Sequence, residues 1–241
     1  MSDLRIALVG EGPTDYLVIE AALKSLLAKP FTMIQLQPEA TQPIMGTGWC
    51  GVLKWCQAAH QRHHGSIDTD PTLVGFDLII IHLDVDVASK QYCDCGGAVA
   101  AIAQDSNWGS LPCRQPCPPV SDTVDFLGEV IKSWLGQVTP GDRTLFCLPA
   151  QSSDTWLAAA VLHSSHPLLA NAECELNLES RLKQLPKAQR INKTKTDYQK
   201  HAPHITQKWL QVKQICTQAE VFEHLVLATI KSMQQKVNNN T

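Results

Sequence analysis

Two kinds of hydrophobic pattern alternate along the chain. Short apolar runs, which are typical of buried strands, lie at residues 4–9, 32–37, 76–83 and 144–148. Between and after these runs, apolar residues recur at helical spacing in segments that begin near residues 13, 52, 121 and 153. Strands that alternate with helices indicate an α/β fold, in which a mostly parallel sheet is flanked by helices on both faces.

Two regions depart from this alternation. Clustered Cys, Gly and Pro at residues 88–120 predict an irregular, Cys-rich insertion. The chain after residue 165 is helical and polar in pattern, with a weak helix at 173–185 and a stronger one at 218–235. The sequence therefore predicts an α/β domain over residues 1–165 and a helical C-terminal lobe over residues 166–241.

The composition is that of a folded protein without a membrane segment. Of the 241 residues, 44% are hydrophobic and 18% are charged, so a packed core is expected and wholesale disorder is excluded. No apolar run approaches the roughly 20 residues of a membrane span, and the N-terminus lacks the layout of a signal peptide. We therefore expect a cytoplasmic protein, whose nine cysteines are free thiols or metal ligands rather than disulfides.

Basic residues are concentrated in one part of the chain. Residues 181–213 contain nine lysines and arginines and a single acid, Asp197. This leaves +8 (9 − 1) in the segment and −11 (11 − 22) in the remainder, out of a net charge of −3. Such a segment suits a polyanion such as a nucleic acid, although an ordinary solvated helix face carries similar charges.

Acidic residues follow three of the predicted strands. Glu11 and Asp15 come after the first strand, Asp84 and Asp86 after the third, and Asp154 after the fourth. Because ligands of parallel sheets bind beyond the carboxyl ends of the strands, we expect these carboxylates to line one crevice. Each acid alone also has an ordinary explanation, since acids favour the first turn of a helix and cap helices.

The crowded carboxylates predict a metal site, because they repel one another unless a cation offsets their charge. Ligand sets made of oxygen alone suit Mg2+ or Mn2+, and two such ions about 4 Å apart would clamp the oxygens of a phosphodiester. We expect Glu11, Asp84 and Asp86 to hold one ion, because Asp84 and Asp86 point the same way on a strand. Asp15 and Asp154 are expected to help with the second ion, and Glu11 is alternatively a general base.

The order of these motifs resembles a known family. The Glu-Gly-Pro-Thr-Asp motif at 11–15 and the Asp-Val-Asp motif at 84–86 each follow a hydrophobic strand. They are similar to the two motifs of the Toprim domain, which topoisomerases, bacterial primases and OLD (overcoming lysogenization defect) nucleases share. With Asp154 after a proline-ended strand, residues 4 to about 163 resemble the stand-alone Toprim-like proteins of bacterial defence loci. The resemblance implies a Toprim-like fold and a metal-dependent nuclease of anti-phage defence.

The resemblance to OLD nucleases further implies a Ser-x-x-Glu-like element and a downstream lysine. Ser152-Ser153-Asp154 is the nearest counterpart of the first, with Asp in place of Glu and a different spacing. The lysine is either Lys193 or Lys195, and it is expected to stabilise the charge that develops on the leaving oxygen.

The basic segment around these lysines is expected to contact nucleic acid. Four residues are expected to bind the backbone without reading its sequence: Arg190, Lys193, Lys195 and Lys200. Three aromatic residues of the same region either stack on bases or pack between helices: Tyr198, His201 and Trp209.

The insertion carries two close pairs of thiols, Cys93 with Cys95 and Cys113 with Cys117. A structural Zn2+ bound by these four thiolates would hold a poorly packed loop together. Other residues are available to replace one ligand, namely His82, Cys50 or Cys56. The spacings differ from the usual Cys-x2-Cys arrangement, so free thiols in a loop are the alternative.

These observations together predict a Mg2+- or Mn2+-dependent endonuclease that hydrolyses phosphodiester bonds of DNA or RNA with two ions. Two alternatives stay open. One is a regulatory or binding subunit that acts with an ATPase encoded nearby, which the resemblance suggests. The other is a phosphoryl-transfer enzyme that acts on small phosphoesters. The resemblance also suggests a homodimer.

Overall fold

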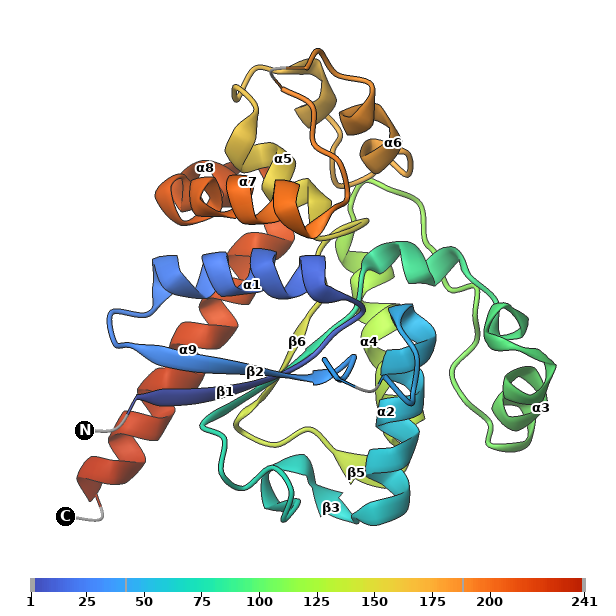
Figure 1. Cartoon of the computed structure of the whole chain (residues 1–241). Coiled ribbons are helices and arrows are strands. Elements are labelled where there is room, and N and C mark those ends of the chain that lie inside the picture. Colours follow the sequence, from blue (N-terminus) through green and yellow to red (C-terminus); the bar gives the residue numbers. More distant parts are fainter. Residues whose placement is uncertain (1–2, 42, 188, 240–241) are drawn as a thin grey trace.

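A four-stranded parallel sheet forms the centre of the computed structural model, which describes residues 3–41, 43–187 and 189–239 (Figure 1). The strand order is β2-β1-β4-β6, and the strands are β1 (Leu4–Val9), β2 (Phe31–Gln37), β4 (Leu78–His82) and β6 (Thr144–Cys147). In the parallel register, Ile6 lies opposite both Met33 and Leu78. The predicted α/β fold with a mostly parallel sheet is confirmed.

The strands feed two hydrophobic cores, one on each face of the sheet. On β4, Leu78 and Ile80 enter one core, whereas Ile79 and Ile81 enter the other. Every residue of β4, including His82, is buried. This two-sided burial is the reason why the strand reads as a continuous apolar run rather than an alternating one.

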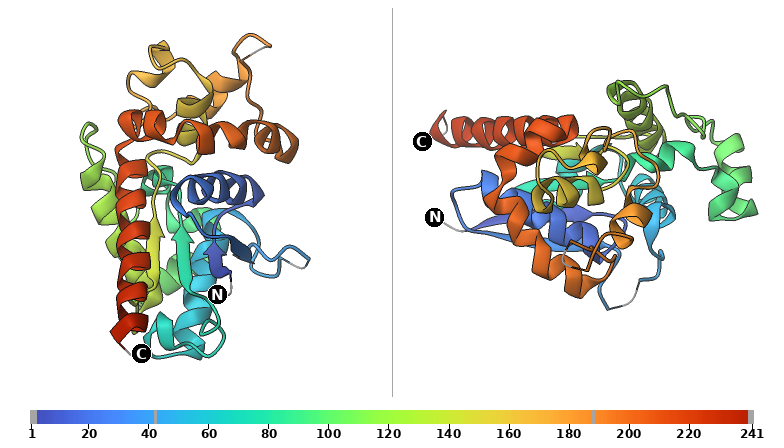
Figure 2. Two further views of the ribbon diagram at one scale, coloured as in Figure 1. Left: turned by 90° about the vertical axis from the view of Figure 1, so that its left-hand side faces the viewer. Right: turned by 90° about the horizontal axis from the view of Figure 1, so that it is seen from above.

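Helices cover both faces. The first face carries α1 (Pro13–Leu26), α5 (Asp154–Val161), α6 (Leu178–Lys183), α7 (Lys195–Gln207), α8 (Trp209–Ile215) and α9 (Thr217–Asn239). The second carries α2 (Gly48–Arg62) and α4 (Ser121–Leu135), which contact each other. α7 lies against α1, and the long α9 runs beside β6 (Figures 1 and 2). The helices after residue 165 therefore share one core with β1 and α1.

Some elements differ from the sequence-based expectation. β3 (Gly65–Ser66) and β5 (Val138–Thr139) form a second, two-stranded sheet, which is too short to leave a periodic pattern. The predicted irregular insertion contains α3 (Gly97–Asp105), and this segment projects from the body of the molecule (Figure 2). The helical pattern of α7 is interrupted by Pro203, which hides its extent in the sequence.

Two disulfides attach the segment 88–120 to the rest of the fold. Cys95 pairs with Cys50 of α2, and Cys117 pairs with Cys174, which precedes α6. Each bond closes a loop of several tens of residues and so restricts the unfolded chain. The expectation of free thiols or metal ligands is therefore wrong for these four cysteines.

The predicted zinc site is also wrong. Cys95 and Cys117, two of its four thiols, are engaged in the disulfides. The other two, Cys93 and Cys113, carry free thiols and join no metal-binding group among the described residues. The insertion is thus cross-linked by disulfides and not by the expected zinc ion.

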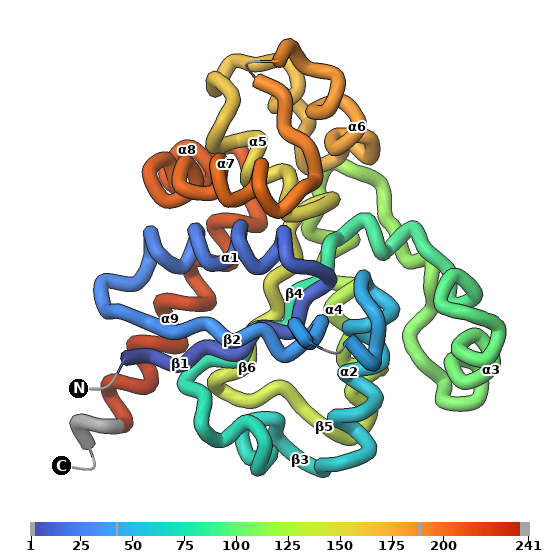
Figure 3. The backbone as a smooth tube through the Cα atoms, in the orientation of Figure 1, coloured from blue at the N-terminus to red at the C-terminus, as the bar shows by residue number. Residues whose placement is uncertain are grey.

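The start of β1 and the C-terminal half of α9 lie at the same end of the molecule (Figure 3). Leu4, Leu27 and Ile230 line one pocket there, which brings the two chain regions together. In the described part of the chain, no helix has the length and apolar character needed to cross a membrane.

Candidate functional site

The carboxyl ends of β1 and β4 mark the point where the sheet topology changes direction. From β1 the chain crosses to β2 on one side, and it later returns to β4 on the other side of β1. In open parallel sheets the connections diverge at such a point and leave a crevice. Glu11 follows β1 and Asp84 follows β4, so both acids lie at the place that the sequence predicts.

Ser153 joins two of the predicted carboxylates. It immediately precedes α5, its hydroxyl donates to Oδ1 of Asp15 at 2.7 Å, and its backbone N–H donates to Oδ1 of Asp84 at 2.9 Å. Glu11 is attached as well, because its Oε1 accepts the backbone N–H of Asp84 at 2.8 Å. Asp15, Asp84 and Ser153 are buried, so these bonds hold the carboxylates in fixed orientations.

The histidine at the end of β4 belongs to the same cluster. The side chain of His82 is 0% exposed, and its Nε2 lies 3.2 Å from Oδ1 of Asp84. Asp15, His82 and Asp84 each offer a ligand atom, and these atoms lie within 4.8 Å of one another. His82 therefore adds a nitrogen donor beside the carboxylates that the sequence predicts as ligands. The sequence signal is a polar residue in an apolar strand, two positions before Asp84.

Asp86 does not have the predicted strand geometry. β4 ends at His82, and Asp86 lies in a 3-10 turn over Val85–Ser89, so the strand rule that aligns it with Asp84 does not apply. Its carboxylate is partly exposed and lies 3.7 Å from Nζ of Lys90. Burial and the negative charge of Asp84 raise the pKa of Asp86 to about 6, so Asp86 interacts electrostatically with the cluster.

Of the two candidate lysines, Lys193 reaches the acidic residues. Its Nζ lies 3.6 Å from Oδ2 of Asp154 and 3.4 Å from Oε2 of Glu179. Lys195 is exposed and is the first residue of α7. Thr194 caps this helix through its side chain, which leaves Lys193 in the preceding loop.

Burial and mutual repulsion disfavour ionisation of the carboxyl groups in the cluster. Burial raises the pKa of Glu11 well above its usual range, and Asp84 and Asp15 raise it further. Burial also raises the pKa of Asp154 to about 7, although a nearby lysine opposes the shift. Burial alone would lower the pKa of His82, but the surrounding carboxylates raise it to about 9. All these shifts are those that a bound cation would relieve.

Several buried polar atoms of the cluster lack a hydrogen-bond partner. They are both carboxylate oxygens of Asp154 and both ring nitrogens of His82. A buried polar atom without a partner is costly and calls for an explanation. A divalent cation satisfies such atoms, and carboxylate and imidazole groups are common metal ligands. The donor set therefore fits a metal ion.

The remaining predicted residues lie outside the cluster. Three basic residues are exposed near the start of α7 and within it: Arg190, Lys195 and Lys200. The aromatic residues of this region are buried between helices, so the base-stacking interpretation is wrong for Tyr198, His201 and Trp209. Trp209 packs edge-on against Trp156 of α5, with ring centres 5.5 Å apart.

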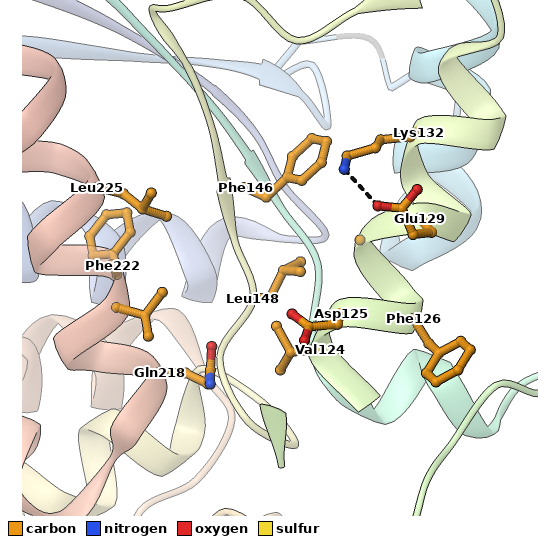
Figure 4. A pocket seen from close by; sticks show the side chains of 12 residues that line it. Val124, Asp125, Phe126, Glu129, Lys132, Phe146, Leu148, Gln218, Phe222 and Leu225 are labelled. Carbon is orange, nitrogen blue, oxygen red and sulfur yellow. Dashed lines mark hydrogen bonds and ion pairs between the residues drawn. The ribbon is translucent and has the colours of Figure 1, made fainter. Parts of the chain in front are cut away.

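A mostly apolar pocket lies between α4 and α9, beside the edge strand β6 (Figure 4). Phe126, Phe146 and Leu225 line it, together with an ion pair between Glu129 and Lys132. None of the predicted site residues lines this pocket. The pocket and the acidic cluster are therefore separate features.

Comparisons with protein-family models, curated proteins and solved structures find no match for this chain. The resemblance to the Toprim domain therefore depends on the motifs at residues 11–15 and 84–86 and on the order of the acids. The evidence for function therefore lies in the site itself.

Proposed function

We propose that this protein is a divalent-metal-dependent nuclease with a Toprim-like catalytic domain, acting on DNA or RNA in bacterial anti-phage defence. The observation that carries the proposal is the convergence of acids from separate segments. Glu11, Asp15 and Asp84 are linked at the switch point of the sheet, and Asp154 follows β6 beside them. The elevated pKa values of Glu11, Asp15 and Asp154 support a cation at this place.

Asp15 and Asp84 are the carboxylates best oriented to hold a divalent ion, because Ser153 bonds both. Asp154, whose oxygens have no hydrogen-bond partner, and Asp86 are the acids available for a second ion. When bound, such ions supply Lewis-acid stabilisation of the charge that develops during phosphodiester hydrolysis.

Lys193 is placed to stabilise charge on the leaving oxygen. Asp154 and Glu179 restrain its ammonium group at the edge of the cluster. Burial would lower the pKa of Lys193, but Asp154 and the other acids raise it overall, so the side chain remains charged at neutral pH. A fixed positive group of this kind is effective where negative charge appears in the transition state.

The basic surface near α7 suits a polymeric phosphodiester. Three exposed basic residues lie within ten residues of Lys193 in the sequence, namely Arg190, Lys195 and Lys200. Such residues contact phosphates without reading bases, so binding should weaken steeply with added salt. A small phosphoester would not need this extended positive surface.

The test is cleavage of supercoiled plasmid, single-stranded DNA and bulk RNA by the purified chain with Mg2+, Mn2+ or EDTA. Asp84→Asn is compared with the wild type, and Asp125→Asn, which changes an exposed carboxylate on α4, serves as the matched control. We expect metal-dependent cutting that Asp84→Asn abolishes and Asp125→Asn retains. Folding of each variant is verified by its urea unfolding curve.

Cutting that survives in Asp84→Asn would refute the assignment of the site. Absence of cutting in the folded wild type with every substrate and metal would refute an autonomous nuclease. That result would favour the alternative of a subunit that acts with an ATPase encoded nearby. The assay is then repeated with such an ATPase and ATP.

A further inference from the structure

His82 is the one member of the cluster that a site for two Mg2+ ions does not require. It ends β4, and alternation along this strand places it on the same face as Leu78 and Ile80, toward α1 and α5. A methyl group added to Gly10 at the end of β1 would stand 3.7 Å from its Nδ1, so the ring fits directly between the two strand ends. Apolar residues occupy the rest of the strand, so a polar side chain here needs a partner.

The protein satisfies this ring only in part. His82 is fully buried, and neither ring nitrogen has a hydrogen-bond partner among the described residues. Its Nε2 makes an ion-pair contact with Oδ1 of Asp84 at 3.2 Å, and this oxygen already accepts the backbone N–H of Ser153. Asp15 is held by the same serine and completes a set of three ligand atoms within 4.8 Å of one another. The imidazole is thus directed into a group of carboxylates, with its Nε2 facing Asp84.

We propose that Nε2 of His82 is a metal ligand together with Asp15 and Asp84, and that this site prefers a first-row transition-metal dication to Mg2+. Imidazole nitrogen binds transition metals well, whereas Mg2+ prefers oxygen ligands and retains its waters. Affinity for a mixed nitrogen and oxygen set rises along the transition series from Mn2+ to Cu2+. The inference rests on the metal site of the proposed nuclease but does not depend on cleavage.

The competing explanation is that His82 is a buried imidazolium. In that case it offsets the charge of Asp84 and stays off the metal, and the ion is bound by carboxylates alone. The two explanations differ in one observable property, namely whether a nitrogen nucleus is directly coordinated to the bound ion.

The experiment uses the whole purified chain and Mn2+ as the probe. Loss of the free Mn2+ electron paramagnetic resonance signal gives the Mn2+ affinity, and competition gives the Mg2+ affinity. Electron spin-echo modulation from 14N, compared with protein made with 15N-histidine, reports a coordinated imidazole. We expect histidine modulation in the wild type and Mn2+ binding at least about tenfold tighter than Mg2+ binding, or ~1.4 kcal/mol.

Two variants sharpen the test. His82→Asn replaces the nitrogen ligand with an amide and should remove the modulation and most of the preference for Mn2+ over Mg2+. His201→Asn is the matched control, because His201 is also buried and also has an unpartnered ring nitrogen, but lies on α7 outside the cluster. It should leave both readouts unchanged.

Wild-type protein that binds Mn2+ without histidine modulation would overturn the proposal, and this result does not depend on whether any variant folds. Equal affinities of the wild type for Mn2+ and Mg2+ would overturn the stated preference. The failure of the nuclease proposal is distinguishable, because it appears as histidine-coordinated Mn2+ without cleavage. Metal-dependent cleavage without histidine coordination would instead refute only the role of His82.

Discussion

Replacement of Asp154 with asparagine is expected to remove a large part of the pH dependence of stability in the metal-free protein. The carboxylate is 1% exposed and neither of its oxygens has a hydrogen-bond partner. Burial raises its pKa from the usual 3.8 to about 7. The folded protein therefore binds this proton more tightly than the unfolded chain does, and stability falls as the pH rises between these two values.

The magnitude follows from the two pKa values. For a carboxyl group that titrates near pH 7 in the folded state and near 3.8 in the unfolded state, the free energy of unfolding decreases by about 2–3 kcal/mol from pH 5 to pH 8. Asparagine does not ionise in this range. The wild type should therefore lose about 2–3 kcal/mol more than Asp154→Asn. Comparison of two pH values cancels the differences between the two side chains that do not depend on pH.

The assay is equilibrium urea unfolding in EDTA at pH 5 and pH 8, with free energies from linear extrapolation. Asp125→Asn is the control, because its carboxylate is exposed on α4, and its two free energies should change in parallel with those of the wild type. Parallel behaviour of Asp154→Asn and the wild type would refute the reasoning. Such behaviour would mean that burial does not raise the pKa of Asp154 in the folded protein.

Two further predictions concern the lysine and the cysteines. Lys193→Ala should lower the single-turnover rate of metal-dependent cleavage at saturating nucleic acid by about a hundredfold or more. Lys195→Ala, two residues away and exposed, should weaken nucleic-acid binding but leave that rate nearly unchanged. Equal losses in single-turnover assays would contradict the choice of Lys193. Thiol titration of denatured, unreduced protein purified without reductant should find five free thiols among nine cysteines. Nine reactive thiols would contradict the two disulfides.

Local patterns in the sequence were sufficient for the main strands and several helices. The helix predicted to open at Ser121 spans Ser121–Leu135 in the structure, and the central strand runs within the predicted 76–83. These elements have strong periodicity or continuous burial, which a short window of sequence records. The same is true of the acids, because the end of a buried strand is recognisable and the carboxyl ends of parallel strands meet at one edge.

Contacts between residues that are distant in the sequence could not be predicted from such local patterns. The pairing of Cys50 with Cys95 depends on how α2 meets the segment that follows β4, and no local signal encodes that approach. The short β3 and β5 pair only because remote loops meet. Ser153 gains its place in the site by bonding carboxylates from two other segments.

The sequence by itself determined which residue types stand at the ends of the strands, and hence that carboxylates would converge. The tertiary structure alone decided which members of the set interact. The packing places Asp86 in a 3-10 turn and the ring of His82 beside Asp84. It also brings Lys193 rather than Lys195 to Asp154. The physical reason is that periodicity fixes the side of a strand or helix on which a residue lies, whereas distances between side chains depend on how the elements pack.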